Sequence, residues 1–390
     1  MSVAGLATVA IAALASAFMA WAIGAGSSGS TPFAPAVGAN AISVMRAGFL
    51  VGILGFAGAV LQGANVSETV GTGLIGGVTL TPLAVVTVLG IGATLVAFGV
   101  FAGYPIATAF TVTGAVVGVG LALGGTPAWA AYREIVGLWV AVPFVGGGVA
   151  YATATVLRSA DRDQLTIPAL GAIVGAIVAN IRFAALGTDG ARSIAQVLAD
   201  AIGGSGLPLL AGSSAVIALA VAAVLYWDVG RAPVAGMRHF LVVMGGLVAF
   251  SAGGSQVGLA VGPLLPLVGD SIPLGAILLG GGLGLLVGSW TGATRMIKAI
   301  AQDYSSLGPR RSISALIPAF VLAQSAVFLG VPVSFNEIVV SAIMGSGLAV
   351  EGWDGVSGAK MGYTVLAWVG SLALALGVGY GGFRVVEVLL

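Results

Sequence analysis

The sequence predicts an all-α polytopic membrane protein, built from two inverted-topology repeats with broken or re-entrant helices. Of its 390 residues, 58% are hydrophobic and only 7% are charged, and the mean hydropathy is +1.12. Soluble domains carry about 25% charged residues, so this composition cannot provide a soluble surface. The apolar runs are long and continuous, whereas a transmembrane β-barrel would show alternating strands of about ten residues.

Apolar runs bounded by charges and Pro/Gly clusters predict about 10–12 transmembrane segments. The first run, residues 3–23, has no basic region before it, so it resembles a membrane helix more than a cleaved signal peptide. Residues 35–44 are too short to cross alone, because a crossing needs about 20 residues. We expect them to form the second half of a broken or re-entrant unit.

Two stretches of the chain occur twice, in the same order and at nearly the same spacing. The first is the Gly/Ser-rich break AGSSGSTPFAP at 25–35, whose second copy is GGSQVGLAVGP at 253–263. The other is GYPIATAF at 103–110, which is echoed by GVPVSFNE at 330–337. We predict two repeats, residues 1–157 and 237–390, joined by central linker spans at 158–236. Coincidence in a chain rich in Gly and Ala is the alternative.

Charge predicts that the two copies face opposite sides of the membrane. Residues 292–311 contain Arg295, Lys298, Arg310 and Arg311, whereas the matching residues 63–82 contain no Lys or Arg. Cytoplasmic loops accumulate Lys and Arg, so the second window is expected inside and the first outside. Inverted repeats of this kind are typical of secondary transporters, whose substrate sites lie near the midplane. Unwound backbone at that depth must be buried in protein or line a cavity.

The repeated motifs resemble those of the inorganic phosphate transporter (PiT) family of cation-coupled phosphate permeases. That family carries a duplicated Gly-Ala-Asn-Asp-Val-Ala-Asn-Ala motif, each followed later by Gly-x-Pro-Val-Ser-Thr-Thr-His. Residues 25–32 with 105–110, and 253–260 with 332–337, are similar to these pairs. The resemblance implies secondary transport of inorganic phosphate. The Asn and Asp of the family's first motif correspond to Ser27 and Ser28 in the first copy and to Ser255 and Gln256 in the second. The His of the family's second motif corresponds to Phe110 and to Glu337.

A phosphate site can be built from hydrogen-bond donors without a buried cation. Unwound backbone, helix N-termini and hydroxyl groups all supply such donors. We therefore predict a substrate site made of the polar residues in the four repeated stretches. The alternative for each hydroxyl is that it satisfies broken backbone or caps the helix after Pro105 or Pro332. The predicted substrate-binding residues are Ser27, Ser28, Ser30, Thr31, Thr108, Ser255, Gln256, Ser334 and Asn336.

Coupling to a cation is expected at Glu337, with Ser28 and Gln256 contributing. Glu337 lies in an apolar stretch, and ionisable residues inside the membrane are costly and usually functional. The family acids associated with sodium binding are absent here, so either Na⁺ or H⁺ is expected as the coupling ion. The alternative places Glu337 at the membrane interface, in contact with water.

Other classes of function are disfavoured by the residues that are present. The chain has no cysteine and one histidine, and Walker A, His-Glu-x-x-His and Gly-x-Ser-x-Gly motifs are lacking, so no enzyme and no cofactor are expected. A net charge of +1 gives no reason to expect nucleic acid. The expected partners are phosphate, the lipid bilayer of the cell membrane and, as an option, a second copy in a homodimer. A permease or channel for sulfate or another oxyanion is the alternative function.

Most tryptophans, Trp139 and Trp368 among them, are expected at the membrane interfaces.

Overall fold

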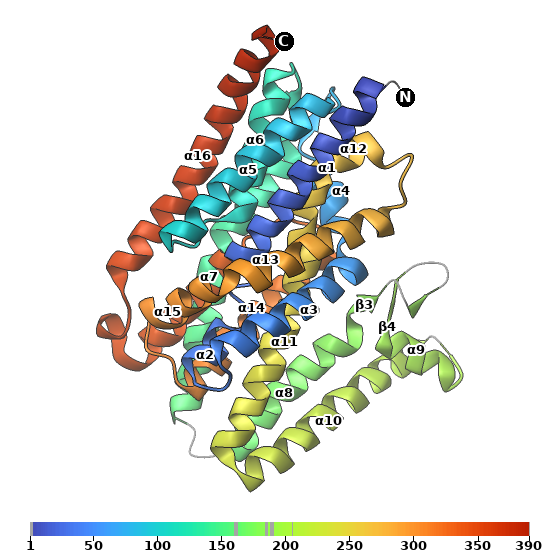
Figure 1. Cartoon of the computed structure of the whole chain (residues 1–390). Helices are drawn as coiled ribbons and strands as arrows, with labels where there is room; N and C mark the ends of the chain where they lie inside the picture. Colours follow the sequence, from blue (N-terminus) through green and yellow to red (C-terminus); the bar gives the residue numbers. More distant parts are fainter. Residues whose placement is uncertain (1–2, 160–162, 184–185, 188–190, 205, 390) are drawn as a thin grey trace.

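The computed structural model describes residues 3–159, 163–183, 186–187, 191–204 and 206–389, and it is built almost entirely of helices (Figure 1). In this described part, 10 helices are long and apolar enough to cross a membrane. Large apolar side chains such as Phe144 and Leu207 are 76% and 79% exposed, which suits contact with lipid. The prediction of an all-α polytopic membrane fold is confirmed.

The first half of the chain begins with α1 (Val3–Ile23), which continues as one π-helical turn, η1 (Gly24–Ser28). Turns at 29–33 then separate η1 from the short helix α2 (Ala34–Gly38). The break lies where it was predicted, and the helix that follows it is shorter than the unit predicted at 35–44. The half continues with α3 (Val44–Gln62), α4 (Ala64–Thr72), β1 (Ile75–Gly76), α5 (Pro82–Ala102), α6 (Thr108–Ala122), β2 (Thr126–Pro127) and α7 (Trp129–Ser159).

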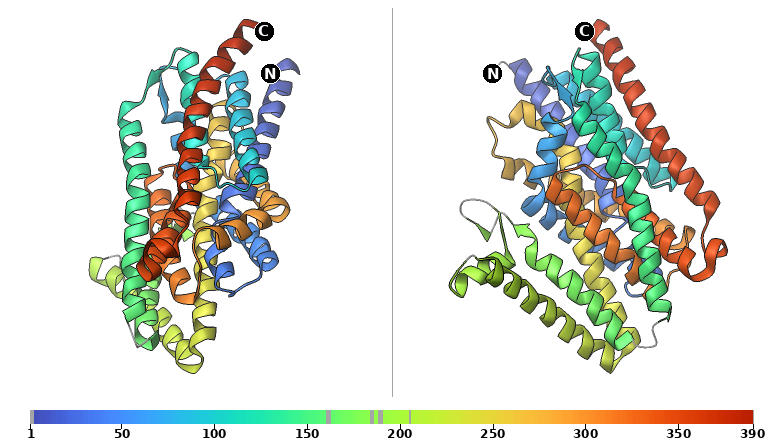
Figure 2. Two further views of the ribbon diagram at one scale, coloured as in Figure 1. Left: turned by 90° about the vertical axis from the view of Figure 1, so that its left-hand side faces the viewer. Right: turned by 180° about the vertical axis from the view of Figure 1, so that it is seen from behind.

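The centre of the chain forms a pair of long antiparallel helices that lies beside the remainder of the molecule (Figures 1 and 2). Its elements are α8 (Asp163–Asn180), β3 (Arg182–Phe183), β4 (Arg192–Ser193), α9 (Ile194–Ala201) and α10 (Leu207–Arg231). The last half contains α11 (Pro233–Val261), η3 (Gly262–Leu264), α12 (Leu265–Val268), α13 (Leu274–Asp303), α14 (Pro309–Leu329), α15 (Phe335–Glu351), η4 (Gly352–Gly355) and α16 (Gly358–Leu389).

Each half contains a helical hairpin with a non-helical tip. In the first, α5 and α6 are joined by residues 103–107; in the second, α14 and α15 are joined by 330–334. Both tips begin at a glycine in the left-handed region, Gly103 (φ 75°) and Gly330 (φ 67°), which ends the preceding helix. An antiparallel contact closes each base, Ile75 with Pro127 in the first hairpin and Ser305 with Val356 in the second. Each hairpin therefore enters and leaves on one side.

The two halves pack through equivalent, exchanged contacts. Helix α6 lies against α16, and α15 lies against α7; likewise α13 packs on α1, and α3 on α11. Glycines allow these close crossings: a Cβ atom on Gly118 would lie 2.3 Å from the Leu376 carbonyl oxygen, and one on Gly345 would lie 2.0 Å from that of Gly147. Helix α1 descends from the N-terminal end while α11 rises toward it, and α7 descends while α16 rises (Figure 1). The halves are thus inverted relative to each other.

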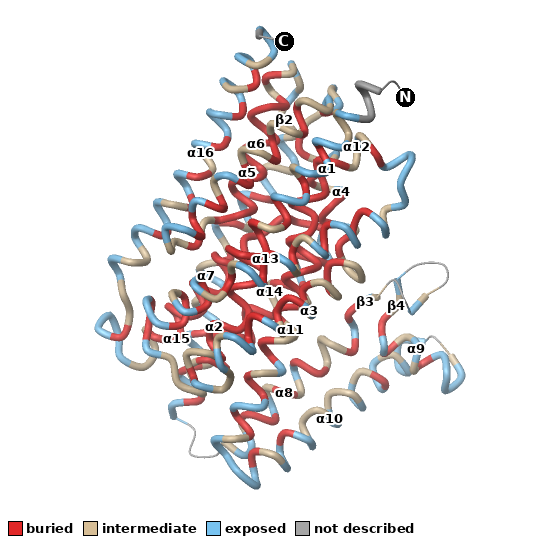
Figure 3. The backbone as a smooth tube through the Cα atoms, viewed as in Figure 1, coloured by how far each residue is buried: buried red, intermediate tan, exposed pale blue. Residues whose placement is uncertain are grey.

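The second Gly/Ser-rich stretch differs from its prediction. Residues 253–263 were expected to be unwound, but α11 continues through Val261 and only Gly262–Leu264 leaves the α-helical form. The glycines serve close packing instead, since a Cβ atom on Gly253 would lie 1.8 Å from the Gly55 carbonyl oxygen of α3. This part of α11 runs through the buried centre of the molecule (Figure 3).

The division into residues 1–157, 158–236 and 237–390 stays a prediction.

Candidate functional site

A buried polar cluster lies where the repeated stretches meet. The Gln256 Oε1 atom accepts hydrogen bonds from Thr108 Oγ1 at 2.6 Å and from Ser27 Oγ at 3.2 Å. The Gln256 amide nitrogen donates to the Val333 carbonyl oxygen at 2.7 Å. The side chains of Ser27, Thr108 and Gln256 are all 0% exposed. The π-helical turn, the start of α6, the C-terminal part of α11 and the α14–α15 tip therefore converge.

Asn336 joins the two hairpin tips across this cluster. Its Nδ2 group donates to the Ile106 carbonyl oxygen at 2.6 Å and to the Gly26 carbonyl oxygen at 3.1 Å. Its Oδ1 atom is buried and has no hydrogen-bond partner in the described part of the chain. The Asn336 side chain thus connects α15 to the tip of the α5–α6 hairpin and to the π-helical turn. Its Oδ1 atom remains available as an acceptor.

The helix N-termini of α6 and α15 both begin at this cluster. Their N-cap residues, Ala107 and Ser334, make no side-chain capping hydrogen bond. The first amides of a helix have no partner within the helix, and its N-terminus carries a partial positive charge. The hydrogen bonds of the cluster come from neutral side chains only, as far as the structure describes them. Helix N-termini of this kind can hold an anion without a buried Lys or Arg.

Three predicted residues satisfy local backbone instead of facing the cluster. Ser30 Oγ and Thr31 Oγ1 donate to the Ser27 carbonyl oxygen at 3.2 and 3.1 Å, and Ser28 Oγ lies 3.5 Å from the Ile23 carbonyl oxygen. For these three hydroxyls the structure favours the alternative in which they satisfy broken backbone and do not bind substrate. The end of a π-helix leaves carbonyl groups that need hydrogen-bond donors.

Ser255 and Ser334 are placed differently. Both side chains are 0% exposed, and both hydroxyl oxygens lack a hydrogen-bond partner in the described part of the structure. Ser255 precedes Gln256 on α11, and Ser334 follows the Val333 carbonyl group that Gln256 contacts. A buried hydroxyl without a partner costs free energy, so these two are available for a ligand.

Glu337 lies in the first turn of α15 and is 2% exposed. Its Oε2 atom has no hydrogen-bond partner in the described part of the chain. The burial of Glu337 disfavours the alternative in which this side chain reaches water at the membrane interface. An isolated buried carboxylate is very costly, so this group must carry a proton or meet a cation.

Trp139 and Trp368 are not interfacial, contrary to the prediction. They are 6% and 3% exposed, and each fixes the tip of the other half's hairpin. Trp139 Nε1 donates to the Pro332 carbonyl oxygen at 3.0 Å, and Trp368 Nε1 donates to that of Pro105 at 2.8 Å. The Phe110 ring also stacks on Trp139 with ring centroids 3.9 Å apart. One feature of the sequence could have indicated this role: Trp139 and Trp368 are separated by nearly the same number of residues as the two copies of each motif.

The fold and the site together define a class. Two inverted halves whose broken elements meet in a buried polar cluster are characteristic of secondary transporters. The chain matches the model of the "Phosphate transporter family" over residues 23–379, and it therefore belongs to that family. The family is one of transporters, so the protein is not an enzyme.

Individual relatives agree with this assignment. The chain is 28% identical over 360 residues to the "Putative phosphate permease" of Pyrococcus furiosus, with 85% of each chain covered. It is 25% identical over 403 residues to "Inorganic phosphate transporter 2-1, chloroplastic" of Arabidopsis thaliana, covering 90% of this chain and 68% of that one. A solved structure described as "The sodium-dependent phosphate transporter" matches with a TM-score of 0.79 at 22% identity, covering 98% of this chain and 100% of the other. The last likeness shows the shared fold.

Proposed function

We propose that this protein carries inorganic phosphate across the cell membrane by alternating access, coupled to the entry of Na⁺ or H⁺. The observation that carries the proposal is the meeting of Ser27, Thr108, Gln256 and Asn336 at two uncapped helix N-termini. Phosphate oxygens accept hydrogen bonds, and this cluster offers hydroxyl, amide and backbone donors from both repeats. Family membership supports phosphate as the anion.

The closed state of the cluster supports the proposal of alternating access. Its donors bond to one another and to backbone carbonyl groups, and Ser27, Thr108, Gln256 and Asn336 are all 0% exposed. Phosphate can reach them only if one hairpin tip withdraws and releases these bonds. Since the α5–α6 and α14–α15 hairpins enter from opposite sides, withdrawal of one or the other tip would open the site to one side at a time.

Glu337 is the proposed coupling residue. It follows Asn336 directly in α15, and its buried Oε2 atom lacks a hydrogen-bond partner in the described chain. A proton or Na⁺ bound there would neutralise the carboxylate beside an incoming anion, which lowers the cost of burying both charges. Gln256 is retained as a contributor through its shared oxygen, whereas the Ser28 hydroxyl is directed to the carbonyl group of Ile23.

Uptake of radiolabelled phosphate into proteoliposomes tests the proposal. We expect an imposed inward gradient of either Na⁺ or H⁺ to drive accumulation, and unlabelled phosphate inside to accelerate exchange as a carrier requires. Indifference to both gradients would exclude symport. Stronger competition by sulfate than by phosphate would favour the alternative oxyanion permease, and linear flux without trans-stimulation would favour a channel.

The plasma membrane as location and the homodimer as oligomer also remain proposals. Fractionation of the host membranes shows whether the protein is in the plasma membrane. Light scattering of the purified protein in detergent, corrected for bound detergent, checks the second.

A further inference from the structure

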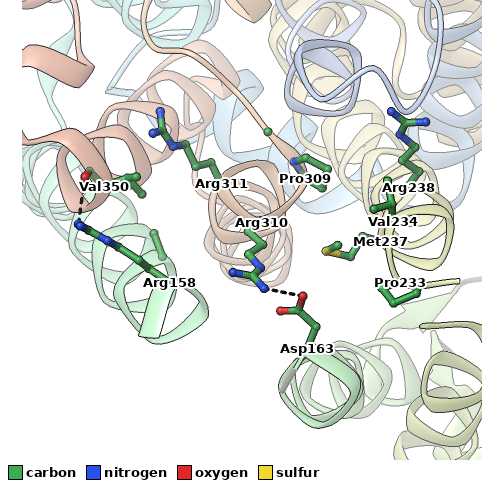
Figure 4. Close-up of a pocket in the computed structure, with 12 residues that line it drawn as sticks. Arg158, Asp163, Pro233, Val234, Met237, Arg238, Pro309, Arg310, Arg311 and Val350 are labelled. Atoms are coloured by element: carbon green, nitrogen blue, oxygen red, sulfur yellow. Dashed lines mark hydrogen bonds and ion pairs between the residues drawn. The ribbon is translucent and has the colours of Figure 1, made fainter. Parts of the chain in front are cut away.

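A second feature lies far from the hairpin tips, at the end opposite the two chain termini. A cavity of about 610 Å³ opens between α7, α8, α11 and α14 (Figure 4). Much of its floor is apolar, and four arginines surround it. The apolar part includes Ala154, Met237, Pro309 and Val350, and the arginines are Arg158, Arg238, Arg310 and Arg311.

Two of the four guanidinium groups are neutralised within the protein. Arg310 forms an ion pair with Asp163 at 2.7 Å, and Arg311 forms one with Glu351. Among the described residues, Arg158 donates to backbone alone, to the carbonyl oxygens of Val350 at 3.0 Å and Ala349 at 3.4 Å. Arg238 is exposed and makes no hydrogen bond or ion pair within the described residues. Two positive charges, those of Arg158 and Arg238, therefore remain on opposite sides of the cavity.

The cavity also lies at a seam of the fold. The α8–α10 pair lies beside the main body of the molecule, and the Arg310–Asp163 ion pair links α14 to α8 at this point (Figures 1 and 4). This end carries Arg310 and Arg311, which follow the α13–α14 connection at the start of α14, and the positive-inside rule assigns such basic residues to the cytoplasm. The cytoplasmic leaflet is rich in anionic lipids, and basic pockets between membrane helices attract their head groups.

We propose that this cavity binds one anionic phospholipid of the inner leaflet. The phosphodiester lies beside Arg238, and the positive charge of Arg158 on the opposite side of the cavity adds to the attraction. An acyl chain covers the apolar floor beside Met237 and Val350. A free hydrated phosphate would use the arginines but would gain nothing from that floor. The bound lipid would add to the Arg310–Asp163 contact in holding the α8–α10 pair against the core.

Native mass spectrometry of the intact protein in detergent measures this binding directly. Phosphatidylglycerol is titrated against phosphatidylcholine with the same acyl chains, and we expect selective retention of phosphatidylglycerol. Each arginine near the surface contributes roughly a fivefold change in affinity, so Arg158→Gln combined with Arg238→Gln should weaken phosphatidylglycerol about 25-fold. Arg46→Gln is the matched control, because Arg46 is exposed and does not line the cavity.

Two further measurements separate the lipid from other anions. Ala154→Phe fills the floor without changing charge, and we expect it to weaken lipid binding while lipid-free thermal stability shows that the protein is folded. Excess inorganic phosphate, or the glycerophosphoglycerol head group without chains, should not displace the lipid. Equal retention of phosphatidylcholine, unchanged binding by the double variant, or displacement by inorganic phosphate would each overturn the proposal.

Discussion

Thr108 makes one of the shortest hydrogen bonds of the polar cluster, 2.6 Å from its hydroxyl to Gln256 Oε1. In the proposed mechanism this donor is transferred to a phosphate oxygen when the cluster opens. Thr108→Val keeps the volume and removes the donor. A hydrogen bond to a charged group is worth about 1.5–3 kcal/mol, so we expect uptake efficiency to fall about 10–100-fold in the proteoliposome assay.

The matched control for this substitution is Thr153→Val. Among the described residues, the Thr153 hydroxyl of α7 donates to one acceptor, the Val149 carbonyl oxygen of its own helix, at 2.8 Å. Transport should be unchanged in this variant. An equal loss in both variants would show that the effect of Thr108 is general to hydroxyl removal and not specific to the site.

Glu337→Gln separates coupling from substrate binding. An amide cannot release a proton and binds Na⁺ weakly, but it keeps the shape of the side chain. We expect uptake driven by the coupling-ion gradient to fall to background, while exchange of labelled for unlabelled phosphate at equal ion concentrations persists. Comparing the two assays on one preparation measures this. Gradient-driven uptake at the wild-type rate would remove Glu337 from the coupling role.

At the level of residues, the duplicated motifs indicated which polar positions lie together. The polar positions of the repeated motifs do meet, as Ser27, Thr108, Gln256 and Asn336 show. Ser30 and Thr31 could not be separated from them, because any hydroxyl near a helix break can bond either a ligand or the broken backbone. The roles of all these residues in binding remain predictions.

At the level of elements, glycine determines how closely the helices approach. Gly345 of α15 crosses α7 so tightly that a Cβ atom would lie 2.0 Å from a backbone oxygen. Gly345→Ala must therefore separate the hairpin from α7, with an overpacking cost of about 1–3 kcal/mol. We expect a lower midpoint of thermal unfolding in detergent and slower transport, since α7 carries Trp139, which holds the same hairpin's tip.

Gly377→Ala in α16 is the control for this packing argument. Nothing lies within 4 Å of a Cβ atom at Gly377, which is exposed. Alanine is the better helix former by about 1 kcal/mol in water, so thermal stability should be unchanged or slightly higher. If both variants lose stability equally, close crossing does not explain the requirement at Gly345.

Helix breaks were harder to predict than helices because glycine has two uses. The stretch at 25–35 does leave the α-helix, whereas its copy at 253–261 stays helical and uses Gly253 against the backbone of α3. Sequence shows where glycine is, but not whether its missing side chain frees the backbone or admits a neighbour. The repeated Gly-x-Pro motif was the better signal, since both of its copies, at 103–105 and 330–332, became hairpin tips.

For the whole molecule, the inverted arrangement was predictable because a duplicated order of motifs and an unequal distribution of Lys and Arg are both visible in sequence. The placement of the α8–α10 pair was not, because it has no counterpart in the repeats. The packing of α6 against α16 and of α15 against α7 could not be predicted from the sequence either. Each hairpin therefore packs against a helix of the other half, so a movement of one tip would change contacts in both repeats.

Orientation is the property of the whole molecule that can be tested most directly. The loop before α5 lies at the end that holds both termini, and the α13–α14 connection lies toward the opposite, basic end (Figure 1). The positive-inside rule then places exposed Gln302 in the cytoplasm and exposed Thr79 outside. The chain has no cysteine, so Thr79→Cys and Gln302→Cys each introduce one unique thiol. In intact cells a membrane-impermeant maleimide should label Thr79→Cys at once, and should label Gln302→Cys only after permeabilisation. The reverse pattern would invert the whole assignment and place the lipid cavity in the outer leaflet.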